Sequence, residues 1–308
     1  MEYTYTELLN QFPNLIVKEN EPLSNYSHTK TGGPADLLFF PASIKETTAV
    51  VNWTRENNHP LTILGNASNL IVRDGGIRGV TVILTELDNV TVEKNKMVVE
   101  SGAPIIDVSQ IAYEHELTGL EFACGIPGST GGAVYMNAGA YEGEVKDVIE
   151  KVTILTLDGE IYEASNEDME FSYRQSILQK NDDIVLDVTF ALKKGNKEKI
   201  KERMDELTFL RTSKQPLEYP SCGSVFKRPT GHFTGKLIQD AGLQGLTWGG
   251  AQISTKHAGF IVNIDGATAT DYIELIAHIQ EVILDKYDVE LEREVRIIGE
   301  SVEEASKI

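Results

Sequence analysis

The chain has 308 residues, 41% of them hydrophobic and 24% charged, which is typical of a globular protein long enough for two domains. Its 28 basic and 47 acidic residues give a formal net charge of −19, which argues against a general nucleic-acid or anionic-membrane binder. The sequence contains no long apolar run, no signal-peptide pattern and only two cysteines (Cys124 and Cys222) without CxxC spacing, so we expect a cytoplasmic protein with no membrane partner.

The first two-thirds of the chain predict a mixture of helices and strands. A helix is expected over 43–58, where Ser43 and Glu46 have capping-box spacing, and another over 104–116. The pair Asp158-Gly159 predicts a type I′ turn within a hairpin. Short alternating or β-branched runs predict strands over 60–64, 80–84, 97–100 and 184–192, and the hairpin is expected over 152–162.

A change in composition near residue 195 indicates a second unit. The charged segment 195–211 predicts a connecting helix, and two further helices are expected over 236–241 and 271–287. In the longer helix, apolar residues recur at helical spacing. The segment 289–298, VELEREVRII, alternates apolar and charged residues and predicts a final strand.

Two glycine-rich stretches carry the clearest functional signal. GIPGSTGGAVYMNAGA spans 125–140, and LGNASNLIVRDGGIRG spans 64–79. Glycine tolerates positive φ angles, and backbone N–H groups turned into such a loop form an anion site. We interpret the pair as a site for a phosphate-bearing cofactor, whereas the alternative of a solvated surface loop conflicts with the apolar run 134–136. Neither stretch is a GxGxxG fingerprint or a P-loop, so the residues alone leave the cofactor open.

Several motifs, in this order, resemble one flavoprotein family. The set is similar to the FAD-binding elements of the vanillyl-alcohol-oxidase/PCMH superfamily and, within it, to the UDP-N-acetylenolpyruvoylglucosamine reductases. One departure is Ala67, where the family often has glycine; alanine there requires only a milder backbone angle. The motifs are TGGPAD (31–36), the two glycine-rich stretches, FSYRQS (171–176), RTSKQP (211–216), CGSVFKRP (222–229) and LEREVRIIG (291–299).

The resemblance implies the fold and the reaction. It implies an α+β chain with a two-part PCMH-type FAD-binding region over 1–198 (subdomains about 1–85 and 86–198). A smaller α+β substrate-binding domain over 199–308 would return its last strand to the active site. With non-covalent FAD, and NADPH as co-substrate, the enzyme would reduce UDP-N-acetylglucosamine enolpyruvate to UDP-N-acetylmuramate for peptidoglycan synthesis. We expect a monomer.

The resemblance also assigns three catalytic residues. Hydride addition to an enol ether beside a carboxylate builds negative charge, which requires fixed positive charge and then a proton donor. By resemblance, Ser224 donates the proton, Arg174 grips the substrate carboxylate, and Glu294 stabilises the enolate region or relays a proton. Taken singly, these residues would be a turn serine, a surface salt-bridge arginine and a solvated strand glutamate.

Other positions are expected to bind ligands. The substrate contacts are Tyr173, Lys214 and Lys227, while Arg228 stands where some relatives carry a polar amide. The histidines lack HxH or HExxH spacing, so no metal site is expected. The cofactor contacts expected by resemblance are Gly65, Asn66, Ala67, Ser68, Asn69, Gly125, Pro127, Gly128, Ser129, Gly132 and Ala133.

Two rival functions stay open from the sequence. A flavin oxidase of the same superfamily would use oxygen and often a covalent flavin, which His28 or Cys124 could attach. A non-catalytic nucleotide-sugar binding protein would bind the UDP-sugar without consuming NADPH. The three catalytic motifs argue against both.

Overall fold

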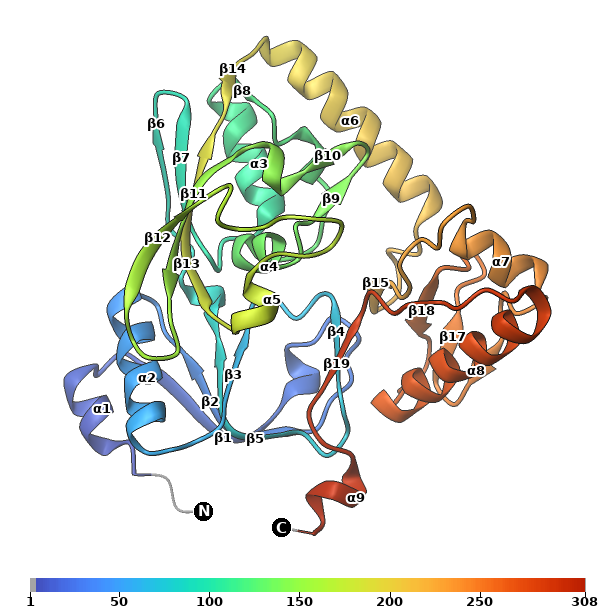
Figure 1. Cartoon of the computed structure of the whole chain (residues 1–308), viewed down its shortest axis with the longest axis horizontal. Coiled ribbons are helices and arrows are strands. Elements are labelled where there is room, and N and C mark those ends of the chain that lie inside the picture. Colours follow the sequence, from blue (N-terminus) through green and yellow to red (C-terminus); the bar gives the residue numbers. More distant parts are fainter. Residues whose placement is uncertain (1–3, 308) are drawn as a thin grey trace. The chain divides into compact units, whose positions relative to one another are not determined.

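The computed structural model describes residues 4–307 and divides them into two compact units (Figure 1). The units are discontinuous in sequence, because two segments from the N-terminal half of the chain belong to the same unit as the C-terminal residues. The division expected from the sequence is instead a single one, after residue 198. Unit 1 comprises the chain up to Glu19, Leu37–Asn66 and Gly79–Phe209; unit 2 comprises Asn20–Asp36, Ala67–Arg78 and the residues from Leu210 onward.

The first sheet has the strand order β1-β2-β5-β3, with β3 and β5 parallel. Its core residues Phe39, Val80 and Val82 are buried with Val50 and Val51 of α2, and this burial fixes the helix on the sheet. The elements are α1 (Thr6–Gln11), β1 (Ile16–Pro22), β2 (Pro34–Phe40), α2 (Ile44–Glu56), β3 (Leu61–Leu64) and β5 (Ile77–Ile83).

Helix α2 begins where its sequence predicts. The Ser43 hydroxyl accepts a hydrogen bond from the Glu46 N–H at 3.2 Å. The Glu46 carboxylate accepts from the N–H of Ala42 (2.8 Å), one residue before the cap. The predicted capping box is therefore confirmed on one side and displaced by one residue on the other.

The second sheet is antiparallel, with the order β12-β11-β13-β7-β6. In β7, Met97 and Val99 are buried while Val98 is 41% exposed, which is the period-2 pattern of a strand with one covered face. Helices α3 and α4 lie against this sheet (Figure 1), and their buried residues belong to the same hydrophobic core as Met97 and Val99. The elements are β6 (Val90–Glu93), β7 (Lys96–Glu100), α3 (Ile105–Glu114), α4 (Thr130–Tyr135), β11 (Ile149–Leu155), β12 (Ile161–Ser165) and β13 (Ile184–Ala191).

The predicted hairpin forms, but its turn is of another type. A type I′ turn requires positive φ at both central residues. Only Gly159 has a positive φ (+88°), whereas Asp158 does not. The Gly159 N–H donates to the Thr156 carbonyl at 3.0 Å, so a type I turn precedes a left-handed glycine. The type I′ prediction was therefore wrong.

Short elements connect these layers. Helix α6 (Lys197–Lys214) carries the chain from unit 1 into unit 2, as the charged segment predicts. The remaining connectors are η1 (Leu23–Asn25), η2 (Leu84–Glu86), β8 (Leu117–Thr118), η3 (Glu121–Ala123), β9 (Gly139–Ala140), β10 (Gly143–Glu144), η4 (Val145–Asp147), α5 (Leu178–Asn181) and β14 (Lys193–Lys194).

Unit 2 contains an antiparallel sheet with the order β15-β18-β17-β16 and the long helix α8. The buried residues Tyr272, Ile276, Ile279 and Ile283 of α8 confirm the predicted helical spacing. The elements are β4 (Leu70–Val72), β15 (Ser221–Ser224), α7 (Thr234–Asp240), β16 (Thr247–Trp248), β17 (Ala251–Ile253), β18 (Phe260–Asn263), α8 (Ala269–Tyr287), β19 (Arg296–Ile298) and α9 (Val302–Ala305).

The predicted final strand over 289–298 was wrong over most of its length. Only β19 forms a strand, paired in parallel with β4. Leu291 and Val295 are buried, four residues apart. The sequence alternates apolar and charged residues over 289–298, but residues 289–295 have no continuous partner strand among the residues described. The alternating pattern alone is therefore not sufficient to form a strand. The mixed α+β class itself is confirmed.

Candidate active site

The two glycine-rich stretches meet in unit 1. Gly65 follows β3, and a Cβ atom at Gly65 would lie 2.2 Å from Ser129 Oγ. Ser129 is the N-cap of α4, and its hydroxyl accepts from the Gly132 N–H at 3.3 Å. Gly128 has a φ of +154°, a conformation that other residues rarely adopt. The structure therefore brings the two stretches together at Gly65 and Ser129.

One buried hydroxyl lies beside the 125–140 stretch. Ser101 is 2% exposed, and its Oγ has no hydrogen-bond partner among the residues described. A Cβ at Gly131 would lie 2.8 Å from the Cβ of Ser101. An unpaired buried hydroxyl costs free energy, so this position favours a polar partner from outside the chain.

The second half of the 64–69 loop belongs to unit 2. Ala67 is buried and has a left-handed φ of +47°, which alanine adopts at a cost of about 1 kcal/mol. Its carbonyl accepts from the His28 N–H at 3.3 Å. Asn69 donates from Nδ2 to the Glu294 carbonyl at 3.3 Å. This half of the loop is therefore built into the same unit as Glu294.

Ser224 and Glu294 lie on neighbouring segments of unit 2. The carbonyl of Val225 accepts from the N–H groups of Glu294 (2.8 Å) and Val295 (3.2 Å). Ser224 ends β15 and is exposed, while Glu294 is half-buried. Residues far apart in the sequence are thus brought together by backbone hydrogen bonds.

Cys222 is a core residue of this unit. It is 2% exposed, and burial raises the pKa of its thiol to about 12. The thiolate is the nucleophilic form, so Cys222 is inert at neutral pH. Burial and the raised pKa of the thiol therefore indicate a structural residue of the core rather than a nucleophile.

The sequence predicts substrate contacts from the cations Lys214 and Lys227, and Arg228 follows Lys227 directly. Lys227 is 18% exposed and pairs with Glu292, with 2.5 Å between Nζ and Oε1. Arg228 stacks on the ring of Phe233, 4.0 Å from its centroid. Lys214 ends α6 and is exposed.

Arg174 and Tyr173 lie in unit 1. Arg174 has a φ of +57°, and its guanidinium donates to the Gly139 carbonyl at 3.0 Å and lies 5.0 Å from the Tyr173 ring centroid. Asn137, which is fully buried, donates to the Ser172 carbonyl at 2.9 Å. The end of the 125–140 stretch therefore holds the turn that carries Arg174. We did not predict this role for Asn137, although its place among glycines, where asparagine tolerates a left-handed angle, was a signal.

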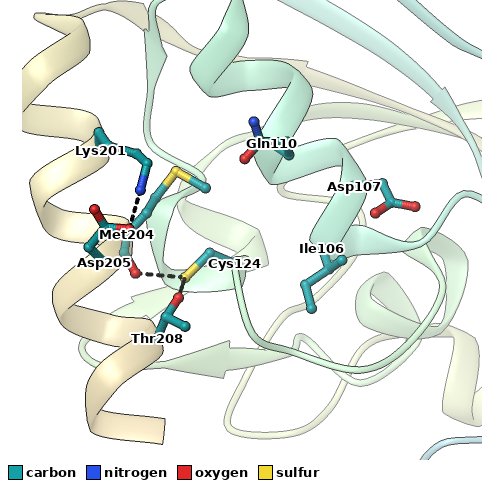
Figure 2. Close-up of a pocket in the computed structure, with 8 residues that line it drawn as sticks. All are labelled: Ile106, Asp107, Gln110, Cys124, Lys201, Met204, Asp205 and Thr208. Atoms are coloured by element: carbon teal, nitrogen blue, oxygen red, sulfur yellow. Dashed lines mark hydrogen bonds and ion pairs between the residues drawn. The ribbon is translucent and has the colours of Figure 1, made fainter. Parts of the chain in front are cut away.

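A separate pocket of about 300 Å³ lies between α3 and α6 in unit 1 (Figure 2). The thiol of Cys124 points toward α6, 3.5 Å from the Met204 carbonyl and 3.6 Å from Thr208 Oγ1. None of the residues expected to bind FAD or the substrate or to act in catalysis in the reductase lines this pocket, and Cys124 enters only the rival oxidase interpretation. Its lining residues are Ile106, Asp107, Gln110, Cys124, Lys201, Met204, Asp205 and Thr208.

Residues 4–307 carry neither a metal cluster nor a membrane-spanning helix. No group of three or more histidine, cysteine, aspartate or glutamate residues in that range has the geometry of a metal site. Within the same residues, every helix is too short or too polar to span a bilayer.

Comparison with known proteins defines first a class and then a family. Residues 35–165 match the FAD binding domain family, and residues 215–298 match the family described as UDP-N-acetylenolpyruvoylglucosamine reductase, C-terminal domain. The chain is therefore a flavin-dependent oxidoreductase.

Relatives extend the match over nearly the whole chain. The UDP-N-acetylenolpyruvoylglucosamine reductase of Enterococcus faecalis is 63% identical over 296 residues, covering 96% of this chain and 98% of the relative. That of Pediococcus pentosaceus is 61% identical over 289 residues, covering 94% and 96%. The crystal structure of the Thermus caldophilus enzyme aligns with a TM-score of 0.81 at 35% identity, covering 92% of this chain and 100% of that structure. The chain belongs to the UDP-N-acetylenolpyruvoylglucosamine reductase family.

Proposed function

We propose that the chain catalyses the NADPH-dependent reduction of UDP-N-acetylglucosamine enolpyruvate to UDP-N-acetylmuramate, a step of peptidoglycan precursor synthesis. The names of its relatives support this substrate. The observation that carries the proposal is the backbone pairing of Val225 with Glu294, which brings the segment of the expected proton donor, Ser224, beside that of the expected catalytic carboxylate.

The glycine stretches fit a flavin dinucleotide. The close approach of Gly65 and Ser129 leaves no room for a side chain, and the unpaired Ser101 hydroxyl adjoins the same turn. The residues proposed to hold the cofactor are those expected from the sequence in the 65–68 and 125–133 segments, whereas the Asn69 side chain donates instead to the Glu294 carbonyl. When bound, FAD supplies the hydride relay from NADPH to the vinyl carbon of the substrate.

The catalytic residues then act on charge and protons. Arg174 would bind the substrate carboxylate with its planar guanidinium and stabilise the developing enolate. Ser224 would donate a proton to the carbon beside the one that receives hydride. Glu294 would hydrogen-bond to the same region or relay the proton.

Cations would bind the remainder of the substrate. Lys214 and Lys227 are proposed for the UDP diphosphate, and Tyr173 for the sugar-bearing end. The Lys227 side chain is 18% exposed, and an anionic group is attracted more strongly to a cation on a partly buried side chain than to a fully exposed one. Its bond to Glu292 would be exchanged or shared when the diphosphate binds.

Two half-reactions followed by flavin absorbance test the proposal. NADPH should bleach the flavin in the absence of the UDP-sugar, and the enolpyruvyl substrate should then restore the oxidised spectrum. Steady NADPH consumption should require the UDP-sugar. Binding of the UDP-sugar without NADPH consumption would instead favour a non-catalytic binding protein, and flavin that stays in an acid-precipitated pellet would favour an oxidase with covalent flavin.

A further inference from the structure

We propose that Asn69 is a positioning residue for Glu294. Asn69 lies in the loop expected to bind the cofactor, yet the structure directs its side-chain amide to the backbone of the expected catalytic carboxylate. The inference rests on the proposed function, because it takes Glu294 as a catalytic residue.

A continuous backbone ladder anchors the segment that follows Glu294. Strand β19 pairs with β4 in parallel, with Arg296 opposite Leu70. Beyond the strands, the Arg73 N–H donates to the Ile298 carbonyl at 2.9 Å, and Glu300 exchanges bonds of 2.9 Å with Gly75 and Gly76. Residues 296–300 are therefore held in register by residues 69–76.

The ladder ends at Asn69. Its carbonyl accepts from the Arg296 N–H at 3.2 Å, and this is the backbone hydrogen bond of the ladder nearest to Glu294. Glu294 lies two residues earlier in the chain. The Asn69 side chain extends the anchoring to Glu294, because Nδ2 donates to the Glu294 carbonyl at 3.3 Å.

The Glu294 backbone is consequently held from two directions. Its N–H donates to the Val225 carbonyl, next to Ser224, and its carbonyl accepts from Asn69. These two hydrogen bonds, one to the N–H and one to the carbonyl of Glu294, fix the position of its Cα atom and the direction of its side chain. A displacement of about 1 Å of a reacting group can cost about 100-fold in rate, so this restraint matters for catalysis.

Removal of the amide tests the proposal. Asn69→Leu keeps the side-chain size and deletes the donor, while Asn69→Gln retains a donor on a longer arm. With Asn69→Leu, reoxidation of the flavin by the enolpyruvyl substrate should slow about 10- to 100-fold. Flavin reduction by NADPH and the FAD dissociation constant should stay within about threefold of wild type, and Asn69→Gln should recover part of the lost rate.

Asn263 provides a matched control in the same unit. Its Nδ2 donates to the Thr29 carbonyl at 3.0 Å, another long-range bond from an amide to the backbone, and that bond does not involve the 292–296 segment. Asn263→Leu should lower the free energy of unfolding without changing the ratio of the two half-reaction rates. A selective loss in the second half-reaction with Asn69→Leu alone supports positioning. Equal slowing of both half-reactions, or loss of FAD binding, overturns it.

A double-mutant cycle asks whether Asn69 acts through Glu294. In a Glu294→Gln background, Asn69→Leu should slow the second half-reaction by less than about twofold, because the group being positioned is already absent. Losses that multiply would overturn the proposal, as would a Glu294→Gln enzyme as fast as wild type. Wild-type turnover tests the proposed function separately: an enzyme that binds flavin but never consumes NADPH with the UDP-sugar would refute the function itself.

Discussion

Gly65 and Ser129 approach so closely that a single added methyl group would place Cβ 2.2 Å from Ser129 Oγ. Each residue belongs to a different glycine-rich stretch, and both lie in unit 1. Ser129 also caps α4, so pressure on its hydroxyl disturbs both the loop and the helix start. This contact therefore joins the two segments expected to bind the cofactor.

Gly65→Ala should damage stability and FAD binding together. Overpacking of this kind costs about 1–3 kcal/mol of unfolding free energy, and displacement of the loop should weaken FAD binding by about tenfold or more. Urea unfolding and a flavin fluorescence titration measure the two effects. Gly235→Ala is the control, because the nearest atom to its added Cβ lies at 3.6 Å and the residue is within α7.

A second substitution checks that the clash is the cause. Ser129→Ala alone should cost about 1 kcal/mol through loss of the helix cap. It also removes the atom that the methyl group added at position 65 would strike, leaving the Ser129 Cβ at 3.4 Å from the added Cβ. The double variant should thus lose less stability than the sum of the single variants; strict additivity would contradict the contact.

The local elements could be predicted because their signals are local. Helix α8 has buried residues at helical spacing, so its existence and its end at Tyr287 followed from periodicity. Its start lies two residues before the predicted one, at Ala269, where Thr268 and Asp271 form a capping box that was not predicted. The cap of α2 at Ser43 followed from the capping-box spacing of Ser43 and Glu46. A two-residue turn signal was less informative: the pair Asp158-Gly159 correctly predicted a hairpin but predicted the wrong type of turn.

The non-local pairings could not be predicted from the pattern. Residues 289–298 alternate like a strand, yet whether they form one depends on which backbone lies beside them. Strand β4 pairs only with Arg296–Ile298. The residues before Arg296 instead form isolated backbone hydrogen bonds with the 225–227 segment. Asp74 similarly accepts hydrogen bonds from the N–H groups of Ala269 and Thr270 at the start of α8. No local sequence motif predicts this contact. The neighbouring placement of Ser224 and Glu294 depends on the same long-range bonds.

Ser224→Ala should separate the two half-reactions. Loss of a positioned proton donor typically slows a step by about 100- to 10,000-fold, and this loss should fall on flavin reoxidation by the enolpyruvyl substrate. Flavin reduction by NADPH should continue at close to the wild-type rate. Ser306→Ala, at the end of α9, serves as the control for serine removal. A Ser224→Ala enzyme that turns over normally would show that another group donates the proton.

Lys227→Met should raise the KM for the UDP-sugar. A hydrogen bond from a charged ammonium to a diphosphate contributes about 1.5–3 kcal/mol, so the KM for the UDP-sugar should rise about 10- to 100-fold while the KM for NADPH changes little. Lys236→Met is the matched control, because Lys236 is also ion-paired, with Asp240 at 2.8 Å, but is 70% exposed on α7. Equal KM values for the two variants would exclude Lys227 from the substrate site.

Protein stability should fall at alkaline pH because of Cys222. Burial raises the pKa of its thiol to about 12 in the folded state, whereas an unfolded cysteine has a pKa of about 8.5. Above about pH 8.5 the unfolded chain therefore binds fewer protons than the folded one, and the unfolding free energy drops by about 1.4 kcal/mol per pH unit until the folded pKa is reached. Burial also raises the pKa of Tyr272, so the contribution of Tyr272 to the loss of unfolding free energy begins above about pH 10.

Urea unfolding between about pH 8 and pH 10 therefore measures the contribution of Cys222 without that of Tyr272. Wild type should lose about 2 kcal/mol over this window, and Cys222→Ala should lose markedly less; parallel curves for the two proteins would show that another group governs the decline.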